Sequence, residues 1–79
     1  MSLFHSVKQE VGVEGMKCEH CEAHVEEALK SIPGVKTVKA DRTKKVAIVK
    51  SENGISEADA KKAVESLPNK TFTGIKTID

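Results

Sequence analysis

Aromatic residues and net charge are both scarce in this chain. It has no tryptophan or tyrosine, and its only aromatic side chains are Phe4 and Phe72. Thirteen basic and twelve acidic residues leave a formal net charge of only +1. A protein that binds nucleic acid usually presents a basic surface and, for single strands, aromatic side chains on which bases stack. The composition therefore argues against nucleic acid as a partner.

Long apolar runs are also missing. None approaches the roughly 20 residues that span a bilayer, and residues 1–8 lack the apolar segment of a signal peptide. We therefore expect a cytoplasmic protein that does not insert into a membrane. The 79 residues are expected to form one domain, residues 1–79, which is too small to enclose a deep substrate cleft.

The only two cysteines, Cys18 and Cys21, are separated by two residues. In a reducing compartment this spacing indicates metal or redox chemistry. Two such thiols can close on one soft metal ion or on each other. The apolar pattern that follows is helical, so Cys21 falls near a helix N-terminus, where partial positive charge favours the thiolate.

The hydrophobic pattern predicts six elements in the order strand, helix, strand, strand, helix, strand. Apolar residues alternate in the predicted strands and recur every three or four residues in the helices. Ser56, with Asp59 three positions later, is a typical start for the second helix. The predicted strands are 7–14, 35–40, 45–50 and 71–78, and the predicted helices are about 20–32 and 56–67. This order predicts an α+β, ferredoxin-like βαββαβ sandwich, with a four-stranded antiparallel sheet and two helices on one face.

The number of sulfur ligands distinguishes between metals. Thiolates suit both Cu(I) and Zn(II). A structural zinc site usually has four protein ligands, whereas two thiolates suffice for Cu(I), which accepts near-linear coordination. The pair therefore favours Cu(I), although Hg(II) also binds two thiolates.

The segment Gly15-Met16-Lys17-Cys18-Glu19-His20-Cys21 and the apolar helical stripe after it closely resemble the heavy-metal-associated (HMA) domain family. The CxHC form is similar to that of its bacterial cytosolic copper chaperones. The resemblance implies Cu(I) binding by Cys18 and Cys21. It also implies transfer of the ion to the metal-binding domain of a copper-transporting P-type ATPase, and a metal-free monomer that a shared metal could bridge into a dimer.

Five further residues are candidates for the surroundings of the metal. Met16 resembles the family's methionine that supports the metal loop from below, and either Lys70 or Phe72 would take the family's position before the last strand. His20 points into solvent or touches a metal at a dimer interface. His24 shares a helix face with His20 or Cys21, so Zn(II) could bind an improvised site in vitro. We expect His5 to be uninvolved.

Charged side chains fall into two groups. The acidic residues of the first helix form a solvated face or, in a sharper hypothesis, an acidic docking patch beside the metal: Glu19, Glu22, Glu26 and Glu27. The lysines of the central strands and turns are expected away from the site: Lys36, Lys39, Lys44, Lys45 and Lys50.

These observations predict a copper chaperone, not an enzyme, that passes Cu(I) to its partner by ligand exchange. Within the family, the alternatives are a metal-binding domain excised from a P-type ATPase and a mercury or zinc carrier. From a different class, a small thiol-disulfide redox protein is disfavoured because the chain is too short for a thioredoxin-like fold.

Overall fold

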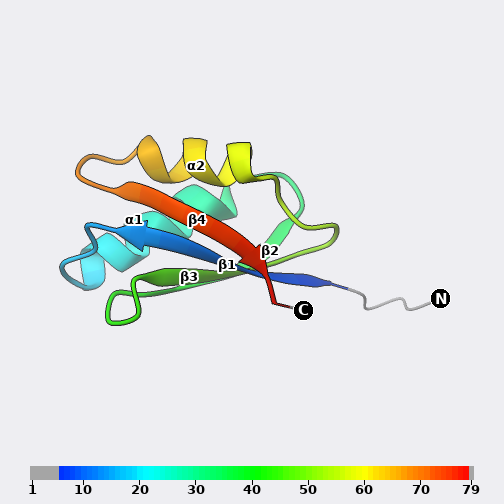
Figure 1. Ribbon diagram of the computed structural model, residues 1–79, viewed down its shortest axis with the longest axis horizontal. Coiled ribbons are helices and arrows are strands. Elements are labelled where there is room, and N and C mark those ends of the chain that lie inside the picture. The colour runs from blue at the N-terminus through cyan, green and yellow to red at the C-terminus, as the bar shows by residue number, and fades with distance from the viewer. Residues whose placement is uncertain (1–5, 79) are drawn as a thin grey trace.

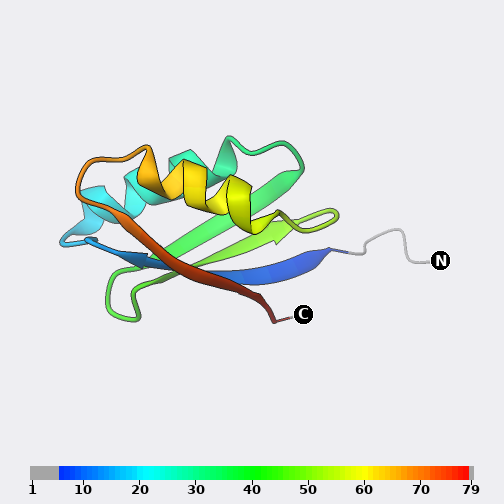
Figure 2. The same cartoon turned by 45° about the horizontal axis from the view of Figure 1, so that its top comes forward.

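Four strands and two helices follow one another in the predicted order. The structure is a computed structural model that describes residues 6–78, so the expectation for His5 lies outside the described residues. The elements are β1 (Val7–Glu14), α1 (Glu19–Lys30), β2 (Val35–Asp41), β3 (Val46–Ser51), α2 (Glu57–Glu65) and β4 (Thr71–Thr77). The strands form one antiparallel sheet in the order β2-β3-β1-β4. Both helices cover the same face of it (Figures 1 and 2), which confirms the ferredoxin-like prediction.

The ends of several elements differ from the sequence prediction by one or two residues, for local reasons. Helix α1 stops at Lys30, because the amide of Ile32 turns back to the carbonyl of Leu29, 3.1 Å away, in a tighter turn. Helix α2 stops before Leu67, whose amide bonds the Val64 carbonyl in the same way. Strand β3 begins at Val46 because Lys45 has a positive φ of 59°, which belongs to a turn.

The hydrophobic core lies between the sheet and the helices. Alternate residues of β1 and β3 point into it, as the period of two predicts, and they meet the apolar stripes of both helices. The fully buried apolar side chains are Val11, Val13, Val25, Leu29, Ala47, Val49, Ala60 and Val64. Neither helix within residues 6–78 is long and apolar enough to cross a membrane.

Gln9 is the one polar residue of the β1 inner face, and it fastens the loop that leads into α2. Its side-chain Nε2 donates to the carbonyl of Ile55 at 3.1 Å, and its Oε1 accepts from the amide of Ile55 at 2.7 Å. Both residues are buried. This paired hydrogen bond satisfies backbone groups that have left the sheet and not yet entered the helix.

Replacing Gln9 with leucine is therefore expected to destabilise the fold. Leucine has a similar volume but leaves the buried amide and carbonyl of Ile55 without partners, at a cost of about 1–3 kcal/mol. Urea unfolding followed by circular dichroism measures the change. Glu10→Leu, on the opposite face of the same strand, is the matched control and should shift stability by less than about 0.5 kcal/mol. Equal effects of the two substitutions would contradict the role given to Gln9.

Candidate metal-binding site

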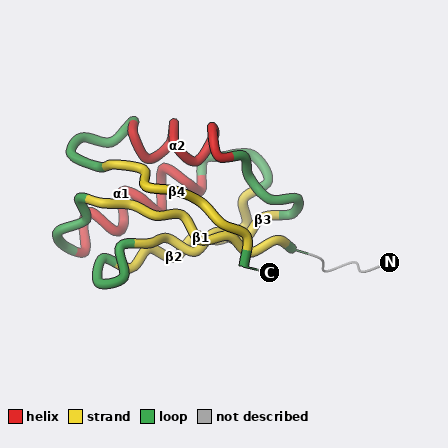
Figure 3. Tube along the Cα trace, viewed as in Figure 1, coloured by secondary structure: helices red, strands yellow, loops and turns green. Residues whose placement is uncertain are grey.

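Three loops meet at one end of the molecule (Figure 3). They are the β1–α1 loop with the first cysteine, the β2–β3 turn and the α2–β4 loop. The amide of Val13 donates to the carbonyl of Lys45 at 2.9 Å, which ties the end of β1 to the β2–β3 turn. The cysteines thus lie at this end of the domain, with Cys18 in the β1–α1 loop and Cys21 in the first turn of α1.

Helix α1 begins between the two cysteines. Cys18 is the N-cap, with an extended backbone (φ −154°, ψ 178°), and its carbonyl accepts hydrogen bonds from the amides of Cys21 at 3.0 Å and Glu22 at 3.2 Å. Its side chain makes no capping hydrogen bond, unlike the Ser, Thr, Asp or Asn usual at this position. The positive end of the helix therefore remains available to the sulfur atoms.

The two thiols are free and close together. Their Sγ atoms lie 3.9 Å apart, with Cys18 exposed and Cys21 half-buried. One soft ion can therefore contact both sulfurs with little movement of the chain, and an incoming ligand can reach them from solvent.

The pKa of the Cys21 thiol is lowered from 9.0 to about 7. Hydrogen bonds from the backbone at Lys17 and then at Cys18 contribute most, and they outweigh a partial desolvation that raises the pKa. The thiol of Cys18 and the positive charge of Lys70 lower it further. A substantial thiolate population at neutral pH suits both metal binding and nucleophilic chemistry.

Gly15 connects the cysteine loop to the α2–β4 loop. It has a φ of +102°, and a Cβ built on it would lie 2.0 Å from the carbonyl oxygen of Asn69. Asn69 itself adopts a positive φ of 62°. The sequence gives no sign of this close approach between loops distant in the chain.

The other candidates from the sequence are placed as follows. Met16 is buried, 9% exposed, and joins the hydrophobic core beneath the loop. Phe72 packs against the same core, whereas Lys70 acts on Cys21 through its charge.

The two histidines are exposed on α1. Within residues 6–78, no group of three or more Cys, His, Asp and Glu side chains is arranged to hold a metal ion. The improvised Zn(II) site of Cys18, Cys21, His20 and His24 is therefore not assembled. His24 instead lines a shallow groove that also includes Leu67.

The charges around this end differ from those expected from the sequence. Glu22 accepts from the amide of Arg42 at 2.7 Å and from its guanidinium Nη1 at 3.2 Å, and Glu26 accepts from the amide of Ala40 at 2.9 Å. Two of the four acids are therefore tethers between α1 and the sheet, not a free acidic patch. Nothing in the sequence pairs Arg42 with a helix twenty positions away.

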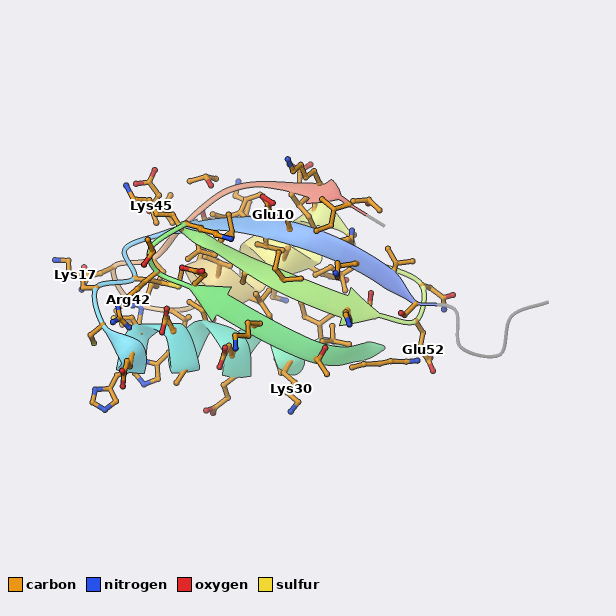
Figure 4. The ribbon with its side chains drawn as sticks, turned by 90° about the horizontal axis from the view of Figure 1, so that it is seen from below. Glu10, Lys17, Lys30, Arg42, Lys45 and Glu52 are labelled. Atoms are coloured by element: carbon orange, nitrogen blue, oxygen red, sulfur yellow. The ribbon has the colours of Figure 1, made fainter. Side chains whose placement is uncertain are left out.

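The expectation that the lysines lie away from the cysteines is wrong for the β2–β3 turn. Lys45 and Arg42 lie at the same end as Lys17 of the cysteine loop (Figure 4). The register of the hairpin places its turn there, beside the end of β1.

Comparison with known proteins agrees with this geometry. The sequence model of the heavy-metal-associated domain matches residues 10–73. The chain belongs to this family. The copper chaperone CopZ of Enterococcus hirae is 42% identical over 62 residues, which cover 77% of this chain and 90% of that protein.

Solved structures of HMA domains superpose closely on this one. A CopZ metallochaperone gives a TM-score of 0.75 at 27% identity, over 84% of this chain and 98% of its own. A copper-binding domain from HMA7, a P-type ATPase, gives a TM-score of 0.73 at 29% identity, over 89% and 97% of the respective chains.

We expect Gly15→Ala to destabilise the protein more than Gly34→Ala does. Both glycines have a positive φ, but a Cβ at Gly34 meets nothing within 4 Å. Gly34→Ala should cost about 1–2 kcal/mol of backbone strain, whereas Gly15→Ala adds a steric collision and should cost roughly 2–4 kcal/mol. Chemical denaturation measures both. Equal losses would contradict the contact with Asn69.

The depressed pKa of Cys21 predicts its reactivity. Alkylation by iodoacetamide, resolved by peptide mass mapping, should reach half its maximal rate near pH 7, because the thiolate is the nucleophile. Lys70→Ala should move the midpoint upward. The folded state binds fewer protons than the unfolded state between about pH 7 and 9, so this thiol favours folding increasingly as pH rises through that window. A midpoint near pH 9 would rule out the proposed environment.

Proposed function

We propose that this protein is a copper chaperone that binds one Cu(I) ion between the thiolates of Cys18 and Cys21. The observation that carries the proposal is a pair of free thiols 3.9 Å apart at a helix N-terminus, of which Cys18 is exposed and Cys21 is half-buried with a pKa lowered to about 7. The related CopZ proteins support copper as the cargo.

Two features favour Cu(I) over Zn(II). The described part of the chain brings only two sulfur ligands together and no third His, Asp or Glu. Cu(I) is satisfied by two soft ligands, whereas a structural zinc site usually takes four. Hg(II) has the same preference for two thiolates, so the competition between these ions is a matter for measurement.

Transfer follows from the low coordination number. A thiolate from a partner adds to the ion, and the three-coordinate arrangement then loses Cys18 or Cys21. The exposed sulfur of Cys18 is the natural point of entry, and the half-buried Cys21 keeps its hold longer. Exposure of the pair supports this exchange, because a partner can approach without any opening of the fold.

The partner that we propose is the metal-binding domain of a copper-transporting P-type ATPase. The structural likeness to such a domain supports it, since two similar folds would present their thiols in similar ways. The same likeness keeps open the alternative that this chain is itself such a domain. We further propose a cytoplasmic setting, a metal-free monomer, and no catalytic activity.

The neighbouring residues are proposed to act without touching copper. Met16 holds the loop to the core, and the charge of Lys70 offsets the negative charge of two thiolates. His20 and His24, both exposed, are left for contacts with solvent or with a partner.

The double variant Cys18→Ser, Cys21→Ser should lose stoichiometric Cu(I) binding while it keeps its fold. A titration with Cu(I) and Zn(II) in competition, under reducing conditions and monitored by NMR, locates the ligands and ranks the metals. Because the histidines are exposed and not grouped with the sulfurs, His20→Ala, His24→Ala is the control and should retain Cu(I) at wild-type stoichiometry.

Retained Cu(I) binding by the serine variant would refute the proposal. Turnover of a disulfide substrate by the wild-type protein would instead favour the redox alternative.

A further inference from the structure

Asn53 and Gly54 form the middle of the loop between β3 and α2. The residue on each side of this pair is held by hydrogen bonds. The amide of Glu52 donates to the carbonyl of the residue before β2 at 3.1 Å, and Ile55 makes its paired hydrogen bond with Gln9. Within residues 6–78, by contrast, no hydrogen bond involves the side chain of Asn53 or the amide of Gly54. The peptide bond between them can therefore rotate more freely than one in a helix or strand.

The chemistry of this pair suits an intramolecular reaction. Asn53 is exposed, so water and base reach its side chain. Gly54 has no side chain to crowd its backbone nitrogen, which can attack the side-chain carbonyl carbon of Asn53 and close a five-membered ring. The fold itself favours glycine at this position, because Gly54 has a positive φ of 82°. A reactive Asn–Gly pair is thus built into an exposed loop.

We propose that Asn53 is a site of spontaneous deamidation in the folded protein. A bond forms between the Gly54 nitrogen and the Cγ of Asn53, the bond from Cγ to Nδ2 breaks, and ammonia leaves with the proton of the Gly54 amide. Water then opens the succinimide ring. Attack at Cγ gives aspartate, and attack at the backbone carbonyl gives isoaspartate, in which the chain continues through the former side chain. Water is the co-reactant, and the inference goes beyond the proposed copper function.

The isoaspartate product affects the hydrogen bonds beside it. It adds one methylene to the backbone between residues 53 and 54, and so lengthens the loop. A Cβ built on Gly54 lies 3.4 Å from the Oε1 of Gln9, which is the atom that accepts from the Ile55 amide. The added methylene therefore falls next to the paired hydrogen bond that fastens this loop to β1, and we expect it to weaken that bond.

The cysteine site lies far from this reaction. Glu52, the residue before Asn53, is at the end of the molecule opposite Lys17 of the cysteine loop (Figure 4). We therefore expect deamidation to change the stability of the fold and to leave Cys18 and Cys21 in their places.

The chain contains its own control, because it has a second asparagine. Asn69 is exposed like Asn53, but the next residue is Lys70, whose side chain crowds the backbone nitrogen. The full reduced protein is incubated in neutral buffer, digested at mildly acidic pH and mapped by mass spectrometry. Conversion at Asn53 should be at least about tenfold faster than at Asn69, since only Asn53 precedes a glycine.

Two further measurements identify the reaction. The rate at Asn53 should rise with pH, because the attacking nitrogen of Gly54 must lose its proton, and an isoaspartyl methyltransferase should methylate the aged protein. Asn53→Gln should nearly abolish the methylation, because the longer side chain closes a ring much more slowly. Equal rates at Asn53 and Asn69 would overturn the proposal. So would an unchanged Asn53 under conditions in which the free peptide Ser-Glu-Asn-Gly-Ile-Ser converts, because the fold would then protect the pair.

Chemical synthesis of the full chain with isoaspartate at position 53 tests the structural consequence. This form should melt about 4–8 °C below the wild-type protein, a shift that corresponds to the loss of about one hydrogen bond. Its NMR spectrum should show shifts at the side-chain amide of Gln9 and the backbone amide of Ile55, with the signals of Cys18 and Cys21 unchanged.

Asn53→Asp is the matched control for the added charge, because it lacks the extra methylene. It should lose less than half as much in melting temperature, as an exposed substitution usually does. Equal losses in the two forms would assign the effect to charge, and an isoaspartate form as stable as the wild-type protein would remove it. Either result would contradict the expected weakening of the bond between Gln9 and Ile55.

Discussion

The whole site depends on one constraint, which is that helix α1 begins between the two cysteines. The Cys18 carbonyl receives the first hydrogen bonds of the helix while its side chain makes no capping bond. This arrangement brings both sulfurs to the positive end of the helix and sets them 3.9 Å apart. A start one turn later would leave Cys21 in a loop, without the backbone contacts that lower its pKa.

Contacts between distant parts of the chain hold that helix start in place. The close approach of Gly15 to Asn69 fixes the entry to the loop, and Met16 packs into the core directly after it. On the other side, Glu22 binds Arg42 of the β2–β3 turn. The dithiol is thus exposed to ligands although the chain on either side of it is anchored to the sheet.

The sequence predicts most of the fold because its signals are local. Alternation in β1, the apolar stripe of α1 and the Ser56 cap of α2, whose hydroxyl accepts from the Asp59 amide at 3.1 Å, each depend on neighbours a few positions apart. The cysteine pair and its position near a helix start were predictable for the same reason. Contacts between loops were not, because the packing of α1 on the sheet brings Arg42 to Glu22, and the pairing of β1 with β4 brings Asn69 to Gly15.

The distribution of charge on the folded protein shows more clearly what the sequence alone does not predict. Composition gives a nearly neutral chain, yet the fold gathers Lys17, Arg42 and Lys45 at the cysteine end. Two of the acids that the sequence places on an exposed helix face, Glu22 and Glu26, instead accept hydrogen bonds from β2 and the β2–β3 turn. Which charges remain free for a partner is therefore decided by tertiary structure.

The copper site that we propose requires that both sulfurs, and no nitrogen, hold the ion. X-ray absorption spectroscopy of the Cu(I)-loaded protein at the copper edge tests this most directly. We expect a first shell of two sulfur atoms, or three where a small thiol in the buffer also binds. A first shell that includes imidazole nitrogen would contradict it, because His20 or His24 would then be a ligand.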